Sequence, residues 1–301
     1  GPRSDNLESR GKAFIAKSTS YRRLGHFDQA VQAAEEGLSV LKGLDCLPEH
    51  VAEGHKQLAN AFNGQGEYDR AEQSFLTGLA LISKENLRLF SLICNDLGVT
   101  YLEQGDLDQA VMYLDQARVG LAKLGNQGQL AETLTNLALV YYDKGEFDLA
   151  LDEVNEALRS AQAGNYPRIQ ATALMHQGMV QKALGAYTDS ISSFSRALEL
   201  ARQNLDQRLI AGITEGLGNA YRKLGDTSKA EVLLNEALLE AEDSAQRYIA
   251  AVFRISLGKM YCQLGSHSTG LEHLKLAEEQ LTGLKSPRRV AETKLFQAAI
   301  F

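Results

Sequence analysis

Histidines are the residues best suited to metal chemistry in this sequence, and their spacing argues against a metal site. His50 and His55 are five residues apart, with Glu53 between them. The zinc-protease pattern His-Glu-x-x-His needs two histidines four residues apart, so that both imidazoles lie on one face of a helix. His267 and His273 lack a nearby set of carboxylates and cysteines. We therefore predict no metal ligands.

Cysteine chemistry is not indicated either. Cys46, Cys94 and Cys262 are far apart and odd in number, and no CxxC pair exists. This pattern predicts neither a zinc site nor a disulfide framework, and it fits a reducing, cytoplasmic setting. The glycines do not cluster into a phosphate-binding loop, and no Ser-His-Asp or Cys-His order stands out. We expect no enzyme activity and no cofactor.

Composition narrows the class of partner. The 301 residues are 44% apolar and 23% charged, as in an ordinary soluble, folded chain. A net charge of −7 provides no basic face for direct nucleic-acid binding. No apolar run approaches the roughly 18 residues needed to cross a bilayer, and no signal peptide is visible. Four prolines, no Trp, and abundant Ala, Leu, Glu and Gln predict helix throughout.

Evenly spaced glycines reveal an internal repeat. The differences between their successive positions are 41, 39, 40, 40, 40 and 40. An aromatic residue usually precedes each glycine by four positions, and a small residue follows it by five. Glycine can reverse the chain with a positive φ, and the small residue lets two helices approach closely. The repeat glycines are Gly25, Gly66, Gly105, Gly145, Gly185, Gly225 and Gly265.

Aspartates and prolines mark the helix starts. A carboxylate near the start of a helix meets the positive end of its dipole. The aspartates at the expected starts of the second helices are Asp28, Asp69, Asp106, Asp108 and Asp148. Proline is tolerated in the first turn of a helix. Pro48 precedes Gly66, and Pro167 precedes Gly185, by the same interval, so Pro287 predicts a further glycine at position 305, beyond the last residue.

The predicted fold is all-α, a right-handed α-solenoid of about seven helix-turn-helix repeats with the first helix of a truncated eighth. Residues 1–7 form a lead-in that opens on Gly1-Pro2, which is typical of the scar that removal of an expression tag leaves. Residues 8–285 form the seven repeats. Residues 286–301, from the expected N-cap Ser286, form the eighth helix, so we expect the natural protein to continue.

The repeats resemble the tetratricopeptide family. Its pattern is Leu-Gly-x-x-Tyr in the first helix, a turn glycine, and Tyr-x-x-Ala in the second, and residues 97–101, 217–221 and 257–261 carry the first part. The family's usual period is about 34 residues, and the glycine spacing here is longer by more than one helical turn in each pair. The longer period resembles the sensor arrays of bacterial STAND-class transcription regulators, such as the maltose regulator. It is also similar to Pins/LGN-type scaffolds and kinesin light chains.

The resemblance implies a binding groove on the concave face, lined by the first helix of each pair. Carrying the family's groove-facing slots onto this chain gives a mixed lining. Amides and basic groups lie at both ends, and apolar and aromatic groups lie in the middle. The predicted groove residues are Lys56, Asn60, Asn63, Asn95, Val99, Leu102, Thr135, Leu139, Tyr142, Met175, Met179, Lys182, Glu215, Asn219, Arg222, Ile255 and Lys259.

The predicted function is a protein- or peptide-binding module, the scaffold or sensor part of a larger signalling or regulatory protein. The amides of Asn60, Asn95 and Asn219 could grip a ligand's backbone, or could instead be solvated or bond neighbouring helices. The alternative function is the small-molecule sensor of a transcription regulator, with its ligand in the groove. A third possible function is that of a passive spacer, or of a self-association element that uses exposed apolar ends at Phe296, Ile300 and Phe301.

Overall fold

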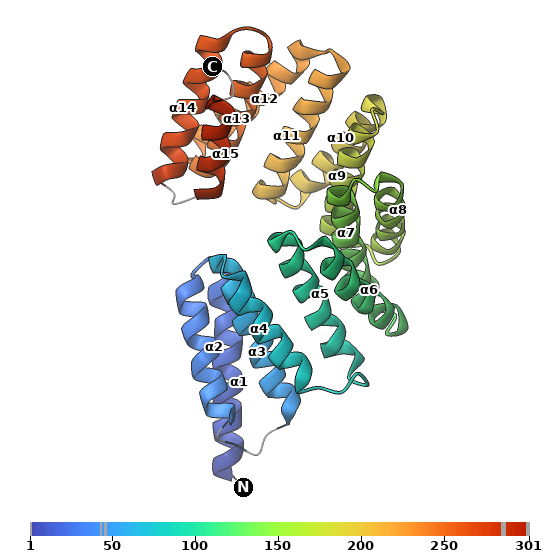
Figure 1. Cartoon of the computed structure of the whole chain (residues 1–301), viewed down its shortest axis with the longest axis vertical. Helices are drawn as coiled ribbons and strands as arrows, with labels where there is room; N and C mark the ends of the chain where they lie inside the picture. Colours follow the sequence, from blue (N-terminus) through green and yellow to red (C-terminus); the bar gives the residue numbers. More distant parts are fainter. Residues whose placement is uncertain (1, 43, 45–46, 284–286, 299–301) are drawn as a thin grey trace. The chain divides into compact units, whose positions relative to one another are not determined.

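Every regular element that the structure describes is an α-helix. The structure is a computed structural model and describes residues 2–42, 44, 47–283 and 287–298. The helices are drawn in chain order in Figure 1. They are α1 (Pro2–Arg23), α2 (Phe27–Lys42), α3 (Pro48–Gln65), α4 (Tyr68–Ala80), α5 (Leu87–Gln104), α6 (Leu107–Lys123), α7 (Gln127–Lys144), α8 (Phe147–Ala163), α9 (Pro167–Ala183), α10 (Tyr187–Gln203), α11 (Gln207–Leu224), α12 (Thr227–Asp243), α13 (Arg247–Gln263), α14 (His267–Gly283) and α15 (Pro287–Ala298).

These helices form two compact units, Gly1–Gly164 and Asn165–Phe301. The N-terminal unit contains α1 to α8, and the C-terminal unit contains α9 to α15. In each unit, consecutive helices pair into antiparallel hairpins, with a repeat glycine at the turn within each pair. The first helix begins at Pro2, six positions before the predicted start of the first repeat. The last begins at Pro287, while Ser286, Ile300 and Phe301 lie outside the described residues.

The chain turns at residues with positive φ, and these recur at half the sequence period. Within a helical pair the turn residue is the repeat glycine, as predicted. Between pairs, the described residues with positive φ lie midway between repeat glycines, and they are one glycine, Gly125, and three residues of other types. From position 105 onward the positive-φ residues are therefore evenly spaced, two to a repeat: Gly105, Gly125, Gly145, Asn165, Gly185, Leu205, Gly225, Ala245 and Gly265.

Both kinds of turn close with the same hydrogen bonds. After α5, the Gly105 N–H donates to the carbonyl of Leu102 at 3.1 Å and the next N–H donates to that of Tyr101 at 2.9 Å. After α10, the Leu205 N–H donates to the carbonyl of Arg202 at 3.2 Å, and the next N–H again reaches five residues back. This is the Schellman pattern of helix termination. A side chain at positive φ costs on the order of 1 kcal/mol, and Leu205 bears that cost where glycine would not.

The predicted start signals match the described helices. Asp106 is the N-cap of α6, and its carboxylate accepts a hydrogen bond from the Gln109 N–H at 3.1 Å. Asp226, which the sequence analysis did not single out, caps α12 in the same way, through the Lys229 N–H at 3.2 Å. The other predicted aspartates, in the first turns of the second helices, are Asp28, Asp69, Asp108 and Asp148.

Small and aromatic residues pack each pair as the repeat pattern predicts. The alanine five positions after the turn glycine is fully buried in most pairs, as at Ala110 and Ala230. In the fifth pair Ser190 replaces it, and its hydroxyl donates to the Gly178 carbonyl at 2.7 Å. The aromatic residue four before the glycine is buried at Tyr101, whose hydroxyl donates to the Glu72 carboxylate of the preceding second helix at 2.9 Å.

Substitution by alanine should have opposite effects on stability at two glycines, one inside α11 and one at its C-terminal cap. Gly225 ends the helix at φ 95°, so Gly225→Ala is expected to lower the free energy of unfolding by about 1 kcal/mol. Gly212 is an exposed helical glycine whose added Cβ would meet only the Met175 Sδ, at 3.6 Å. Gly212→Ala should raise stability by up to about 1 kcal/mol because alanine favours helix.

Urea denaturation of both variants, followed by circular dichroism of the helical signal, measures the two effects. The two substitutions add the same methyl group to the same helical segment, so each serves as the other's control. An unchanged stability of Gly225→Ala would contradict the assignment of Gly225 as a required left-handed residue, and destabilisation by Gly212→Ala would contradict the open space at that glycine.

Candidate binding surface

The first helices of the pairs form one layer in each unit. In the N-terminal unit α1 packs on α3, α3 on α5 and α5 on α7. In the C-terminal unit α9 packs on α11 and α11 on α13. Within its unit, each second helix packs instead against the first helix of its own pair and against that of the next pair where the unit contains one. We call the layer of first helices the inner face, and it carries all the predicted groove residues.

A ladder of hydrogen bonds crosses the inner face of the N-terminal unit. The Asn60 amide donates to the Asp96 carboxylate at 2.8 Å, from α3 to α5. The Asn95 carbonyl oxygen accepts from the Thr133 hydroxyl at 2.9 Å and from the Asn136 amide at 3.3 Å, from α7 to α5. These five residues are the polar ladder. The two predicted asparagines thus bond neighbouring helices, which was one of the two alternatives to ligand contact.

Asn63 makes a further contact between α3 and α5 and retains one hydrogen-bond acceptor without a partner. Its amide donates to the Thr100 hydroxyl at 2.8 Å, again linking α3 to α5. Its side-chain oxygen is buried and has no hydrogen-bond partner in the described structure. A buried acceptor without a partner is costly. Asn63 therefore keeps a buried acceptor that the protein's own side chains leave unsatisfied.

Three predicted groove residues are buried. Lys56 is 9% exposed and its ammonium pairs with Glu53 at 3.0 Å. Thr135 is 3% exposed and donates its hydroxyl to the Ala131 carbonyl at 2.6 Å, while Ile255 is 1% exposed. Little of these side chains is available to a ligand. The other predicted positions of the N-terminal unit, all partly exposed, are Val99, Leu102, Leu139 and Tyr142.

Basic groups meet on the inner face of the C-terminal unit. Lys182 of α9 is partly buried, and its pKa is lowered by burial and by the charge of Arg222, against the opposing effect of Glu215. Burial also lowers the pKa of Arg222 on α11. We call Lys182 and Arg222 the basic pair. Two partly desolvated cations with one nearby carboxylate leave net positive charge at this position.

Neighbouring residues hold the basic pair in place. The Arg222 guanidinium donates to the side-chain oxygens of Gln263 on α13 and, at 3.4 Å, of Asn219 one turn earlier. Glu215 accepts a hydrogen bond from the Ser256 hydroxyl at 3.2 Å. The remaining predicted positions of this unit are partly exposed: Met175, Met179 and Lys259, whose ammonium lies 5.5 Å from the Phe296 ring centroid.

For each of these hydrogen bonds between helices, the sequence analysis predicted one partner and missed the other. Asp96 and Asn136 lie one position after the predicted slots, and Thr133 two positions before one. Their signal was present, because Asp96 follows Asn60, and Asn136 follows Asn95, at close to one repeat interval. Polar residues recurring at nearly the repeat interval on first helices therefore indicate bonds between repeats.

His50, His55 and Cys94 are each restrained by a neighbouring carboxylate or by burial. His50 Nδ1 lies 3.0 Å from the Glu8 carboxylate, whereas His55 is buried and its pKa is lowered by burial and then by the charge of Lys42. Burial raises the pKa of the Cys94 thiol to about 12. Cys46 lies outside the described residues. Among those described, no group of three or more His, Cys, Asp or Glu could hold a metal ion.

A layer of first helices covered by a layer of second helices, repeated along the chain, defines an α-solenoid. The tetratricopeptide repeat family model matches residues 88–163 and 169–238, so this part of the chain consists of tetratricopeptide repeats. Within the described part of the chain, no helix is both long and apolar enough to cross a membrane.

Two relatives share sequence with this chain. Protein KINESIN LIGHT CHAIN-RELATED 3 of Arabidopsis thaliana is 23% identical over 289 residues, which cover 88% of this chain and 43% of the relative. Response regulator aspartate phosphatase E of Bacillus subtilis is 24% identical over 161 residues, covering 52% of this chain and 42% of the relative. The chain thus spans less than half the length of both relatives.

Solved structures share the fold. The apo form of RapI superposes with a TM-score of 0.72 at 12% identity, covering 92% of this chain and 99% of RapI. The Rap conjugation gene regulator of the plasmid pLS20, in complex with the Phr* peptide, superposes with a TM-score of 0.65 at 17% identity. That match covers 92% of this chain and 74% of the regulator.

Proposed function

We propose that this chain is a peptide-binding regulatory module and the scaffold or sensor part of a larger signalling protein. The inner face of its C-terminal unit holds an extended, acidic segment of a partner, and no catalytic step is involved. The observation that carries this proposal is the basic pair. Lys182 and Arg222 are partly desolvated, and Glu215 is the acidic side chain that acts on the charge of Lys182.

A carboxylate from a partner would complete this site. Removing cations from water without full compensation is unfavourable, and an added anion recovers that energy through charge-assisted hydrogen bonds. Arg222 is already fixed by Gln263 and Asn219, so less side-chain entropy is lost on binding. The acidic side chain of the partner is therefore the expected anchor.

The comparisons support peptide binding as the general activity. The pLS20 Rap regulator, which shares this fold, was solved with the Phr* peptide. The other predicted groove residues, such as Asn219 and Met179, then provide modest contacts along the bound segment. Affinity in such interfaces is dominated by a few anchors.

Fluorescence anisotropy with labelled peptide pools tests the proposal. The pools match in length and hydrophobicity and differ in charge: acidic, neutral or basic. We expect the acidic pool to bind best. Lys182→Gln and Arg222→Gln should each weaken that binding about tenfold or more, since a hydrogen bond to a charged group contributes about 1.5–3 kcal/mol.

Arg196→Gln is the matched control, because it removes one exposed positive charge from α10, a second helix of the same unit. Its acidic-peptide affinity should stay at the parent value. Equal weakening of acidic-peptide binding by all three variants would show that the effect depends on net charge and not on the basic pair. No preference for the acidic pool would overturn the proposed anchor.

A further inference from the structure

The inner face of the C-terminal unit contains a pocket near the basic pair. It has a volume of about 340 Å³, and its lining residues belong to α11 and α13. Its floor consists of the buried side chains of Ala211, Ile249 and Val252. Because α11 and α13 are both first helices, the pocket belongs to the inner face and not to the outer layer.

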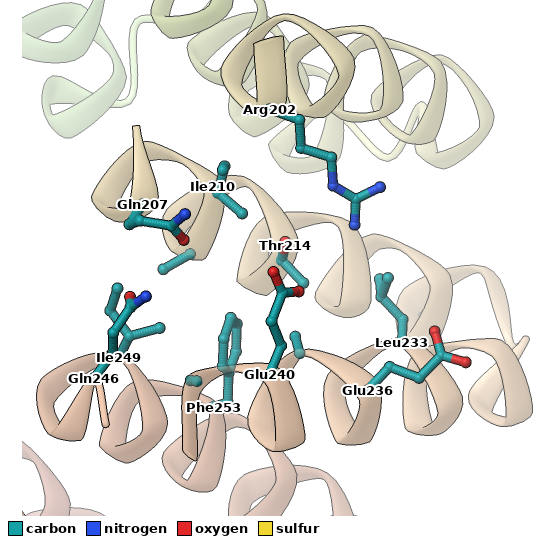
Figure 2. A pocket seen from close by; sticks show the side chains of 13 residues that line it. Arg202, Gln207, Ile210, Thr214, Leu233, Glu236, Glu240, Gln246, Ile249 and Phe253 are labelled. Carbon is teal, nitrogen blue, oxygen red and sulfur yellow. The ribbon is translucent and has the colours of Figure 1, made fainter. Parts of the chain in front are cut away.

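Figure 2 shows a different space of this unit. Leu233 and Glu236 of the second helix α12 also line that space, and the ring of Phe253 points into it. Ala211 and Ile249 line both spaces and therefore lie between them. Buried apolar side chains thus separate the inner-face pocket from the outer layer.

The inner-face pocket is continuous with the basic pair. Glu215 belongs to both, since it lines the pocket and its charge acts on Lys182. Residues three or four positions apart share one face of a helix. One such face of α11 contains Arg208, Gly212, Glu215, Asn219 and Arg222. A ligand that contacts the basic pair can therefore reach the pocket along the same stripe of α11.

Gly212 opens this pocket. Thr172 and Val252 occupy the equivalent positions one repeat earlier and one repeat later, whereas Gly212 lines the pocket without a side chain. An added Cβ at Gly212 would meet only the Met175 Sδ, at 3.6 Å, which is an ordinary contact distance. Any larger side chain there would therefore project into the pocket.

Close packing between helices does not account for this glycine. The other glycines within α9, α11 and α13 are tightly packed, because an added Cβ would lie 3.0 Å or less from a neighbouring side chain: Gly178, Gly216, Gly218 and Gly258. Glycine inside a helix is unfavourable relative to alanine, and one reason for its use is close approach of a ligand to the backbone. The open position at Gly212 fits that reason.

We propose that this pocket holds a bulky apolar side chain of the same acidic segment that the basic pair anchors, so the inference rests on the proposed function. Burial of an apolar side chain against an apolar floor is favourable. Arg208 and Glu215 have opposite charges, so the edge of the pocket favours neither sign. A cavity of about 150 Å³ can hold benzene, so about 340 Å³ admits a leucine or phenylalanine side chain.

The geometry of α11 sets the spacing between the two anchors of the segment. Gly212 and Arg222 are ten residues apart, which corresponds to about 15 Å at about 1.5 Å per helical residue. An extended chain rises about 3.3 Å per residue and covers that length in about five residues. The bound segment is therefore expected to carry its apolar residue about five positions from its acidic one.

Fluorescence anisotropy with a series of labelled peptides tests this expectation. Each peptide contains one glutamate and one leucine in a neutral polar background, and the leucine is placed from about two to about seven positions before or after the glutamate. A matched peptide has alanine in place of leucine. In one of the two directions, leucine about five positions away should raise the affinity about tenfold over alanine, because only leucine fills the pocket.

Variants of Gly212 separate the pocket from the basic pair. Gly212→Leu fills the pocket, so it should lose the gain from leucine and keep the parent's affinity for the alanine peptide. Gly212→Ala should lose part of the gain, although it is expected to be the more stable protein. Ser195→Leu is the matched control, because it places leucine at an exposed position of α10 and should leave both affinities unchanged. Circular dichroism verifies that each variant is folded.

The outcomes distinguish this proposal from the proposed function. No gain from leucine at any spacing, or an equal gain in folded Gly212→Leu, would overturn the pocket and leave the acidic anchor in place. A gain that requires Gly212 and persists when glutamine replaces the peptide's glutamate would support the pocket and overturn the acidic anchor. Absence of binding by every peptide would overturn both.

Discussion

Replacing Phe194 with alanine is expected to lower the free energy of unfolding of the C-terminal unit by about 3–5 kcal/mol. Phe194 of α10 is fully buried, and its ring occupies space that two glycines leave open. A Cβ added to Gly178 of α9 would lie 2.9 Å from the ring, and one added to Gly216 of α11 would lie 2.6 Å from it. The ring thus joins three helices, and its removal leaves a cavity bordered by backbone that cannot readily collapse.

Urea unfolding monitored by circular dichroism measures the loss of stability. Phe147→Ala in α8 is the control, because Phe147 is only partly buried and should cost less. Gly216→Ala should also destabilise the protein, by about 1–3 kcal/mol, because its methyl group would displace the ring. A loss below about 1 kcal/mol for Phe194→Ala would contradict the packing role assigned to the ring.

Replacing Gly270 with alanine is expected to destabilise the last complete pair by about 1–3 kcal/mol, although alanine is the usual residue at this repeat position. An added Cβ would lie 2.2 Å from the Cys262 Sγ, 2.8 Å from the Gly258 carbonyl oxygen and 2.9 Å from the Cys262 N. The first contact is with a side chain, but the other two are with backbone. α13 and α14 must therefore separate to admit the methyl group.

A double-mutant cycle separates these contacts. Cys262→Ala removes the sulfur, so combining it with Gly270→Ala should recover part of the stability lost, while the backbone contacts keep the remainder unfavourable. Ala230→Gly makes the opposite exchange at the equivalent position of α12, where alanine is fully buried, and should cost about 1 kcal/mol. Tolerance of Gly270→Ala would show that the two helices can shift apart at little cost.

These two sites show how far the sequence pattern reaches. The repeat glycines and the buried alanines such as Ala110 follow from local rules, because a turn needs a left-handed residue and a close helix pair needs a small one. The fold class and the helix starts could therefore be predicted. Gly270 departs from the alanine rule, and the close approach of Cys262 and of the Gly258 carbonyl on the partner helix explains why. The turn at Ala245 could not be predicted for a related reason, because nothing in the residue type alanine indicates the left-handed conformation that it adopts.

The sequence predicts which helices carry the candidate binding residues, but it does not predict the contacts that those residues make. The slot rule places Asn60 and Asn95 on the first helices, and the structure agrees. It could not reveal that Asp96 and Asn136 use these amides, because such bonds depend on the offset between neighbouring helices.

The recurrence of left-handed residues twice in each repeat has a consequence for how such a chain can change in length. Loss or gain of half a repeat between Gly105 and Ala245 would leave the backbone turns in register. It would also exchange the roles of all later helices, so that side chains such as Arg222 moved from the inner layer to the outer one. Only the insertion or deletion of two helices at a time keeps each later helix in its own layer. Evolution by duplication is therefore restricted to whole helical pairs here, even though the backbone itself would accept half that length.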